Sequence, residues 1–326
     1  LLDSAIVGRS KVLVTSRRPI RAKLPSLDLE GLNEEDARNM LSSWLPKGRR
    51  VDEFLRSTGT HALSIRLAAS HWAQDDNEKT EAVKVINLKD ESKDRATANK
   101  ARRILERYFS ELDGYERKCI GAFSTFRRPL SITWFLSFLS DLNLDSQDPR
   151  IAIWNLVERR LLIVEDGSNL TCHPLVKEFF SERLSKSSRR QFHRFAARLF
   201  SRHAAQALPD SLTEALLHIE HCYHSGQCGN MATYFNILHG TLNRRHLNYL
   251  GTVIGAWDEF FQLSKLADEN LALSPERRIY LLASSGRSLK HLGRCREALP
   301  KYVRCVENCI QSSSVNTARY SNNLLD

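Results

Sequence analysis

Apolar and polar residues alternate with helical spacing through most of the chain, which predicts a mainly α-helical fold. The first three helical stretches are "NEEDARNML", "VDEFLRST" and the segment from Ala62 to Trp72. Asn33 can cap the first stretch, and the acidic residues that follow it favour the helix dipole. Gly59 closes the second. We expect these short helices to form a helical lid domain over residues 23–85.

A short apolar run, "VLV", precedes the first helix and is typical of a parallel strand that is covered on both faces. The run ends on Thr15, Ser16 and Arg17. In open α/β sheets, ligands such as phosphate bind at this carboxyl edge of the strands. We therefore expect residues 1–22 to be the remnant of a parallel α/β sheet, with Arg17 as a candidate phosphate sensor. The alternative is that Arg17 and its neighbour only solvate a loop.

A second strand signal lies in "LLIVEDGSNLTCHPLVKEFF". Asp166 and Gly167 separate two apolar runs there, which is typical of a tight hairpin because both residues tolerate positive φ. The predicted strands are residues 161–165 and 169–173, and Pro174 can begin the next helix. Because helices precede this hairpin, we expect a winged-helix domain over residues 99–185. His173 would lie where the wing meets the closing helix.

The remaining segments are a polar linker, expected over residues 86–98, and helical repeats similar to tetratricopeptide (TPR) repeats, expected over residues 186–326. Gly293 would form a turn between two helices, while Pro300 makes the last repeat irregular. The small and aromatic residues that such a repeat uses for close helix packing are Gly286, Ala298, Tyr302 and Cys305.

Length and composition narrow the class of protein. A chain of 326 residues is expected to hold two or three domains, and a hydrophobic content of 42% is enough to form their cores. No apolar run approaches the length of a membrane span, and seven cysteines without regular spacing fit free thiols in the cytoplasm. The start, "LLDSAIVG", has neither an initiator Met nor a signal-peptide pattern, so we expect a piece of a longer protein.

The positive charge of the chain is unevenly distributed. The net charge is +10, and basic residues exceed acidic ones between Lys177 and His203. Such a stripe could contact nucleic acid or an acidic protein surface, although a charge run is more often a solvated helix face. Nucleic acid is therefore a possible partner that the sequence does not favour.

The sequence favours neither a zinc site nor a hydrolase. The segment "HIEHCYHSGQC" concentrates residues that bind zinc, but without the paired spacing of zinc modules, and a helix that ends near Gly226 explains it as packing and capping. We expect no metal site in it. No nucleophile elbow or catalytic-triad signature occurs, so an independent hydrolase is not expected. The zinc-binding residue types of that segment are His218, His221, Cys222, His224 and Cys228.

Taken in order, these segments resemble the latter part of a STAND nucleotide-binding switch protein, the class that includes the NB-ARC and NACHT families. "KVLVTSRR" resembles the sensor strand of the NTPase domain, and "GTHALSIRLAAS" resembles a G-x-H-P-L-A-L segment of the helical domain. "CHPLVKEFF" is similar to the Met-His-Asp type motif of the winged helix. Helical repeats at the C-terminal side are also typical of the class.

The resemblance implies roles for particular residues. Arg17, with Thr15 and Ser16 beside it, would sense the terminal phosphate of ATP, and His173 would contact the phosphates of ADP and hold the closed state. The segment at His61 and Ala62 would lie near the base. Ala62 stands where the class usually has Pro, which is a departure from the pattern of the adenine contact.

The largest departure is that no G-x-x-x-x-G-K-[ST] motif occurs in the sequence. The P-loop and most of the magnesium site are therefore expected in an upstream domain of the same protein, although Asp3 could be the tail of a magnesium-binding strand. This chain alone is not expected to hydrolyse ATP. The resemblance implies a cytoplasmic switch that uses ATP or ADP with Mg²⁺, senses an unknown protein or ligand at its repeats, and forms homo-oligomers on activation. The alternatives are a winged-helix DNA-binding regulator and a repeat scaffold without nucleotide.

Overall fold

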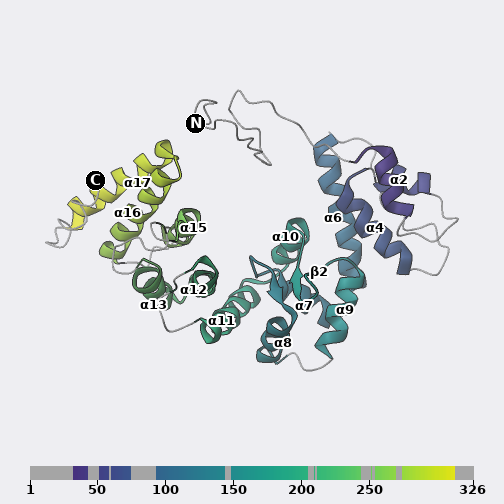
Figure 1. Ribbon diagram of the computed structural model, residues 1–326, viewed down its shortest axis with the longest axis horizontal. Helices are drawn as coiled ribbons and strands as arrows, with labels where there is room; N and C mark the ends of the chain where they lie inside the picture. The colour runs from purple at the N-terminus through teal and green to yellow at the C-terminus, as the bar shows by residue number, and fades with distance from the viewer. Residues whose placement is uncertain are drawn as a thin grey trace.

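The computed structural model of the chain describes residues 32–42, 51–58, 60–74, 93–143, 148–204, 209, 211–243, 251, 254–268 and 274–312. The described elements follow an arc, from α2 (Glu34–Ser42) at one end to α17 (Cys295–Ser312) at the other (Figure 1). Three groups of elements lie along this arc.

The first group contains α2, α3 (Val51–Thr58), α4 (Ala62–Gln74) and α6 (Lys93–Glu111). Asn33 caps α2, because its Oδ1 accepts a hydrogen bond of 2.7 Å from the Asp36 N–H. The apolar faces of these helices are buried, with Leu41, Ile65 and Leu67 fully enclosed. The three short helices of the predicted lid are therefore present.

Helix α6 begins at Lys93, so the last residues of the predicted linker are helical. The stretch "KDRATANK" has few apolar residues and shows no periodicity, but Lys, Arg and Ala are good helix formers. The predicted parallel sheet remnant, residues 1–22, lies outside the described residues.

The second group, the sheet unit, consists of α7 (Gly114–Phe123), β1 (Leu130–Ser131), α8 (Ile132–Asp141), α9 (Pro149–Glu158), β2 (Ile163–Glu165), β3 (Asn169–Thr171) and α10 (Pro174–Glu182). Its strands form an antiparallel sheet of order β1-β3-β2. The central strand places Leu170 opposite Leu130 of β1 and Val164 of β2.

The hairpin turn has the predicted chemistry, with Asp166 at φ 50° and Gly167 at φ 70°. Its strands are shorter than the sequence suggested. Leu161 and Leu162 are fully buried and donate their N–H groups to the Leu156 carbonyl instead of entering β2. They form the turn at the C-terminus of α9 and pack into the core, so they do not extend the sheet.

The third group is helical and antiparallel. It consists of α11 (Lys186–His203), α12 (Leu212–Gln227), α13 (Met231–Asn236), the π-helix η1 (Ile237–Leu242), α15 (Trp257–Asp268), α16 (Pro275–His291) and α17. Neighbouring helices pack in pairs, α11 on α12, α15 on α16 and α16 on α17. Gly293 forms the last turn at φ 72°, as predicted.

One continuous hydrophobic core extends from α2 to α11, and a second lies among α12, α13, η1, α15 and α16. Within the first group, Tyr108 of α6 is fully buried and its hydroxyl donates to the Leu67 carbonyl of α4 at 2.9 Å. The Ser70 hydroxyl of α4 donates to the Glu158 carbonyl of α9 at 2.6 Å, which connects this group to the sheet unit. The expected lid and the sheet unit thus share a single core. Among the helices that the structure describes, none combines the length and apolarity needed to cross a membrane.

The contact between Gly286 and Tyr302 gives a test of the packing of α16 on α17. A Cβ added at Gly286 would lie 2.8 Å from Cε1 of Tyr302, so we expect Gly286→Ala to destabilise the chain by about 1–3 kcal/mol. Gly240→Ala is the control, because a Cβ there meets no atom within 4 Å. Urea unfolding measures both, and an equal fall in the two midpoints would contradict the close packing.

Candidate functional site

The nucleotide-contacting residues expected from the sequence fall partly outside the described structure. Thr15, Ser16 and Arg17 lie among residues 1–31, which are not described. His61, Ala62 and His173 are described, and each lies at the start of a helix.

His61 precedes α4 and is partly buried. Its Nδ1 lies 3.2 Å from the Ser64 hydroxyl, and its carbonyl accepts the Ile65 N–H at 3.0 Å. Burial lowers the pKa of His61, which favours the neutral ring at pH 7. Ala62 is exposed as the first residue of α4. The described contacts of His61 are those of a residue that caps its own helix.

His173 caps α10 in the same way. Its Nδ1 accepts a hydrogen bond of 3.2 Å from the Leu175 N–H, and the ring is exposed. In the neutral ring, an Nδ1 that accepts leaves the proton on Nε2, so Nε2 is a donor. The N–H groups at a helix N-terminus are usually available to an anion. Leu175 instead gives its N–H to His173, and Pro174 has none.

These hydrogen bonds place the imidazoles of His61 and His173 at two separate helix N-termini rather than in one hydrogen-bonded site. The described structure concentrates its charged groups elsewhere, where the loop after α7 meets α12 and α15. We call the four residues there, Arg127, Arg128, Glu220 and Glu259, the arginine joint.

The loop that carries the two arginines is fixed by its neighbours in sequence. The hydroxyls of Ser124 and Thr125 donate to the carbonyls of Gly121 and Ala122, which continues the turn at the end of α7. Phe126 follows and is buried. Its ring packs edge-on against the rings of Phe135, Phe138, Phe200 and His224. With Phe126 held in the core, the next two residues emerge beside α12.

Glu220 is the buried charge of the joint, with its side chain only 3% exposed. Nη2 and Nε of Arg127 donate to its two oxygens at 2.6 and 3.4 Å, and Nε of Arg128 donates at 3.2 Å. Burial alone lowers the pKa of Arg127, but the Glu220 carboxylate offsets this and the guanidinium pKa is raised. A buried carboxylate needs such partners, since an isolated charge in the interior is very costly.

Glu259 of α15 completes the joint. Arg128 donates to one of its oxygens, and Nη1 of Arg127 lies 3.5 Å from the other. The Arg127 guanidinium also lies over the ring of Tyr223, 4.2 Å from its centroid. The joint therefore connects the sheet unit to both α12 and α15.

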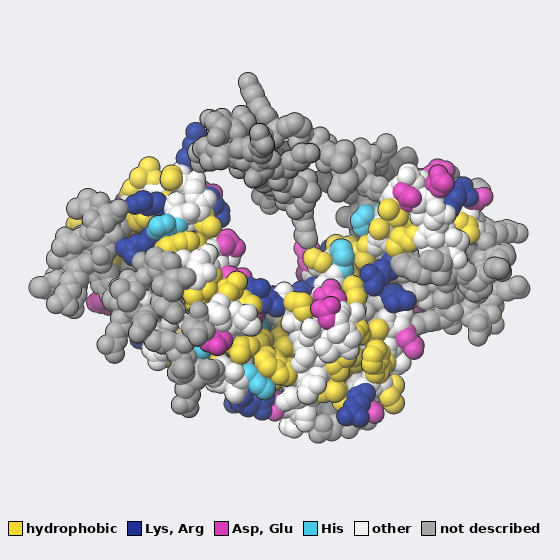
Figure 2. Space-filling model, in the orientation of Figure 1, with side chains coloured by type: hydrophobic (Ala, Val, Ile, Leu, Met, Phe, Trp, Pro, Cys, Tyr) yellow, Lys and Arg dark blue, Asp and Glu magenta, His cyan; other side chains and the backbone are white. Residues whose placement is uncertain are grey.

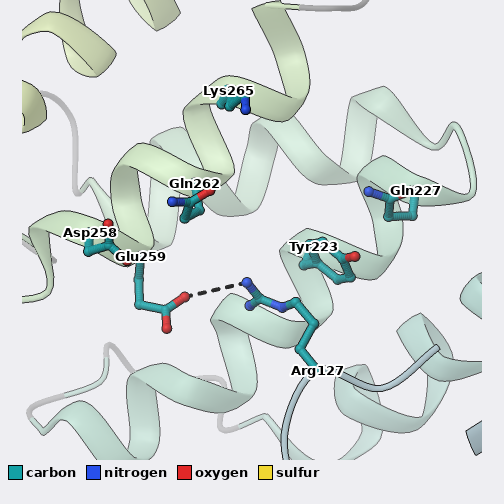
Figure 3. A pocket seen from close by; sticks show the side chains of 7 residues that line it. All are labelled: Arg127, Tyr223, Gln227, Asp258, Glu259, Gln262 and Lys265. Carbon is teal, nitrogen blue, oxygen red and sulfur yellow. Dashed lines mark ion pairs between the residues drawn. The ribbon is translucent and has the colours of Figure 1, made fainter. Parts of the chain in front are cut away.

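A cavity of about 470 Å³ lies beside the joint. Arg127 reaches into it from the sheet unit, and the other lining residues project from α12 and α15 (Figure 3). The lining combines an aromatic ring, two amides and charges of both signs. Its residues are Arg127, Tyr223, Gln227, Asp258, Glu259, Gln262 and Lys265.

Behind the joint, His193 of α11 and His224 of α12 form a buried pair, with their Nδ1 atoms 2.7 Å apart. At that distance one Nδ1 donates and the other accepts, so the accepting ring is neutral. Burial and Arg189 lower the pKa of His193 to about 4. Burial, with the charges of His193 and Arg127, lowers the pKa of His224 well below its usual range.

Lys177 of α10 reaches the same loop. Its Nζ donates to the Arg127 carbonyl at 3.5 Å, and burial lowers its pKa although Glu220 opposes the shift. Helix α10 therefore carries His173 at its N-terminus and, one turn later, a contact with the arginine joint.

Sequence reasoning missed this joint. The signal that was available is the pair of adjacent arginines in "FSTFRRPLS", two cations between a Phe and a Pro. Glu220 lies inside the His- and Cys-rich segment, where one acidic residue gives no signal of its own. In the described part of the chain, no group of three or more His, Cys, Asp or Glu residues is arranged to hold a metal ion. Cys222 and Cys228 instead donate to the carbonyls of Tyr234 and Ser225.

Comparisons with known proteins add little. No protein-family model matches the chain, and no curated protein matches it either. One similar solved structure is the signal-transduction ATPase with numerous domains (STAND) with a tetratricopeptide repeat sensor from Pyrococcus horikoshii. The two share 13% sequence identity at a TM-score of 0.44, over 90% of this chain and 44% of that one. The chain spans less than half of that protein, and a score at this level does not establish a shared fold.

Substitution of Arg127 tests how much the arginine joint contributes to the free energy of unfolding. Arg127→Ala leaves Glu220 with one guanidinium and removes the contact with Tyr223, so we expect a loss of about 3 kcal/mol in the free energy of unfolding. Arg102→Ala is the matched control. Its ion pair with Glu182 is about half exposed and is expected to contribute less than about 1 kcal/mol. Urea denaturation followed by tryptophan fluorescence compares them, and equal losses would be evidence against the joint.

The buried histidine pair predicts a pH dependence. In the unfolded chain these rings titrate near 6.5, whereas in the folded chain they stay neutral to lower pH. The contribution of this pair to the free energy of unfolding is therefore fully present above about pH 6.5. It falls as the pH approaches 4, because the unfolded state binds more protons than the folded state. For His193 the expected loss between pH 7 and pH 5 is about 2 kcal/mol.

The double variant His193→Leu with His224→Phe should reduce the slope of the free energy of unfolding against pH. Urea titrations at several pH values measure this slope. His203→Ala, which removes an exposed ring stacked on Trp134, should leave the slope as it is in the original chain. A double variant with the full slope would show that other groups cause it.

Proposed function

We propose that the chain is the regulatory portion of an ATP- or ADP-dependent signalling switch of the STAND class. In this proposal residues 99–185 are a winged helix. The order helix, strand, helix, helix, strand, strand from α7 to β3, with the β2–β3 hairpin as the wing, supports this assignment. The helical pairs from α11 to α17 are in turn the TPR-like sensor.

The observation that carries the proposal is the double role of α10. Its first residue follows His173, the residue that the class resemblance assigns to the phosphates of ADP. One turn later, Lys177 contacts the loop of the arginine joint. A shift of α10 on nucleotide exchange would therefore act on the ion pairs that hold the repeats.

The residues fit a phosphate ligand in part. Because Nδ1 of His173 accepts the Leu175 N–H, its exposed ring has Nε2 as a donor, which suits a phosphate oxygen. Arg17, with Thr15 and Ser16, would contact the terminal phosphate, and His61 and Ala62 would lie near the base. The P-loop and the magnesium ligands would come from an upstream domain of the same protein. The terminal phosphate of ATP would shift the population between closed and open states through contacts that ADP does not make.

DNA binding is the weaker candidate. Several arginines of the basic stripe are engaged within the protein, and α9, which follows α8 as a recognition helix would, exposes apolar Ile151 and Trp154. On the face seen in Figure 2, Lys and Arg are interspersed with Asp and Glu among the described residues. The engaged arginines are Arg183 with Glu106, Arg189 with the Ser181 carbonyl, and Arg202 with Asp141.

His173 gives the test of the proposal. In the protein that carries both this chain and the nucleotide-binding domain, we expect His173→Ala to accelerate ADP release roughly tenfold to a hundredfold, because a hydrogen bond to a charged phosphate is lost. Release of a fluorescent ADP analogue in a stopped-flow instrument measures this rate. The loosened closed state should also give signalling without stimulus.

Two further variants separate nucleotide contact from helix capping. His173→Ser keeps an acceptor for the Leu175 N–H but removes the Nε2 donor, so it should also release ADP faster. His203→Ala should leave the rate as it is. If ADP release is unchanged in both His173 variants, the repeats are better described as a scaffold without nucleotide.

A further inference from the structure

The cavity beside the arginine joint has an ordered distribution of charge. Asp258, Gln262 and Lys265 line it from α15 at positions i, i+4 and i+7, so they lie on one helix face. The acidic end also includes Glu259, and the basic end is Lys265 (Figure 3). With a rise of 1.5 Å per residue, the two ends are roughly 10 Å apart along the helix.

The acidic end retains capacity to accept hydrogen bonds. One Glu259 oxygen, Oε2, is buried and accepts no hydrogen bond from the residues that the structure describes. Nη1 of Arg127 lies 3.5 Å from it, beyond a good hydrogen bond. The hydrogen bonds that Arg294 donates from Nε and Nη2 go to Glu297, at 2.8 and 2.7 Å; these bonds are the main reason that its pKa is raised, and Asp258 adds to the shift only through its charge.

Between the charged ends the wall carries groups that both donate and accept. Gln262 lies on α15, and Gln227 faces the cavity from α12 (Figure 3). A side-chain amide offers two donors and an acceptor, which matches the N–H and C=O of a peptide bond. The volume of about 470 Å³ is within the usual range for a small-ligand pocket.

We propose that this cavity binds a short peptide of about three residues with both termini free. Its α-amino group would lie at Asp258 and Glu259, its backbone amides at Gln227 and Gln262, and its carboxylate at Lys265. The length follows from the charge spacing, since an extended chain covers 3.3 to 3.6 Å per residue and three residues cover roughly 10 Å.

Binding would also act on the joint. An amino group at Glu259 competes with Arg127 and Arg128 for the same carboxylate, so the peptide loosens the contact of α15 with the sheet unit. Only this second step rests on the proposed function, in which the peptide is the signal that opens the switch. The binding step does not require nucleotide.

The test begins with this chain and an equimolar library of tripeptides with free termini, detected by saturation-transfer NMR without nucleotide. We expect signals from the free library and their loss when the same library is acetylated at the N-terminus or amidated at the C-terminus. A cavity that contains only water gives no signal from either library. That result, or binding that is insensitive to capping, overturns the proposal.

Isothermal titration calorimetry with the best-binding tripeptide then shows which end of the cavity binds which terminus of the peptide. Asp258→Asn and Lys265→Gln should each weaken binding roughly tenfold, because each removes a charged partner. For the acetylated peptide, which has no α-amino group, Asp258→Asn should not weaken the affinity further. The matched controls are Glu307→Gln and Lys186→Gln, exposed residues away from the cavity. If the lining variants bind as well as the controls do, the site is wrong.

The same peptide, added to the full protein in the ADP-release assay, separates the two proposals. Binding with faster ADP release supports both. Binding without any effect on ADP release keeps the peptide site and contradicts its role as the signal.

Discussion

The arrangement of the molecule depends on one buried carboxylate. Glu220 of α12 is buried, and its charge is tolerated there only because two guanidinium groups from the sheet unit reach it. The partners are more than ninety residues away in the chain, so they meet only when the sheet unit and α12 are correctly placed. Because ion pairs and hydrogen bonds are directional, the joint specifies an orientation, whereas an apolar contact would tolerate sliding.

Around this carboxylate, apolar contacts and polar contacts have different roles. Phe126 fixes the loop in the core, and the neutral His193–His224 pair fills the space between α11 and α12. The charged groups lie at the edge, where the cavity gives a ligand access to Glu259. A ligand that competes for one carboxylate can therefore change the joint while the apolar anchor stays in place.

The sequence was informative wherever structure is set by near neighbours. Asp166-Gly167 predicted the hairpin because its φ angles are a local property, and Gly286 with Tyr302 marked a close helix contact at repeat spacing. Two features could not be predicted in this way: the start of α6 at Lys93, inside the predicted linker, and the arginine joint. Arg127 and Arg128 carry no pattern that distinguishes a buried ion pair from a solvated loop, and Glu220 is one acidic residue on an amphipathic helix. The predicted role of His173 remains a proposal, although its place as the cap of α10 is now clear.

The shared core of α2 to α11 restricts how the molecule can deform. Bending between α4 and α6 would separate Tyr108 from Leu67 and expose apolar surface, at a cost proportional to the area opened. Rotation of α12 against α11 would also expose apolar surface, because the ring of Phe200 stacks on His224 and Leu217 packs against the same core. The elements from α2 to α11 therefore form one unit, and a rotation of α12 against that unit breaks the ion pairs of Glu220 together with these apolar contacts.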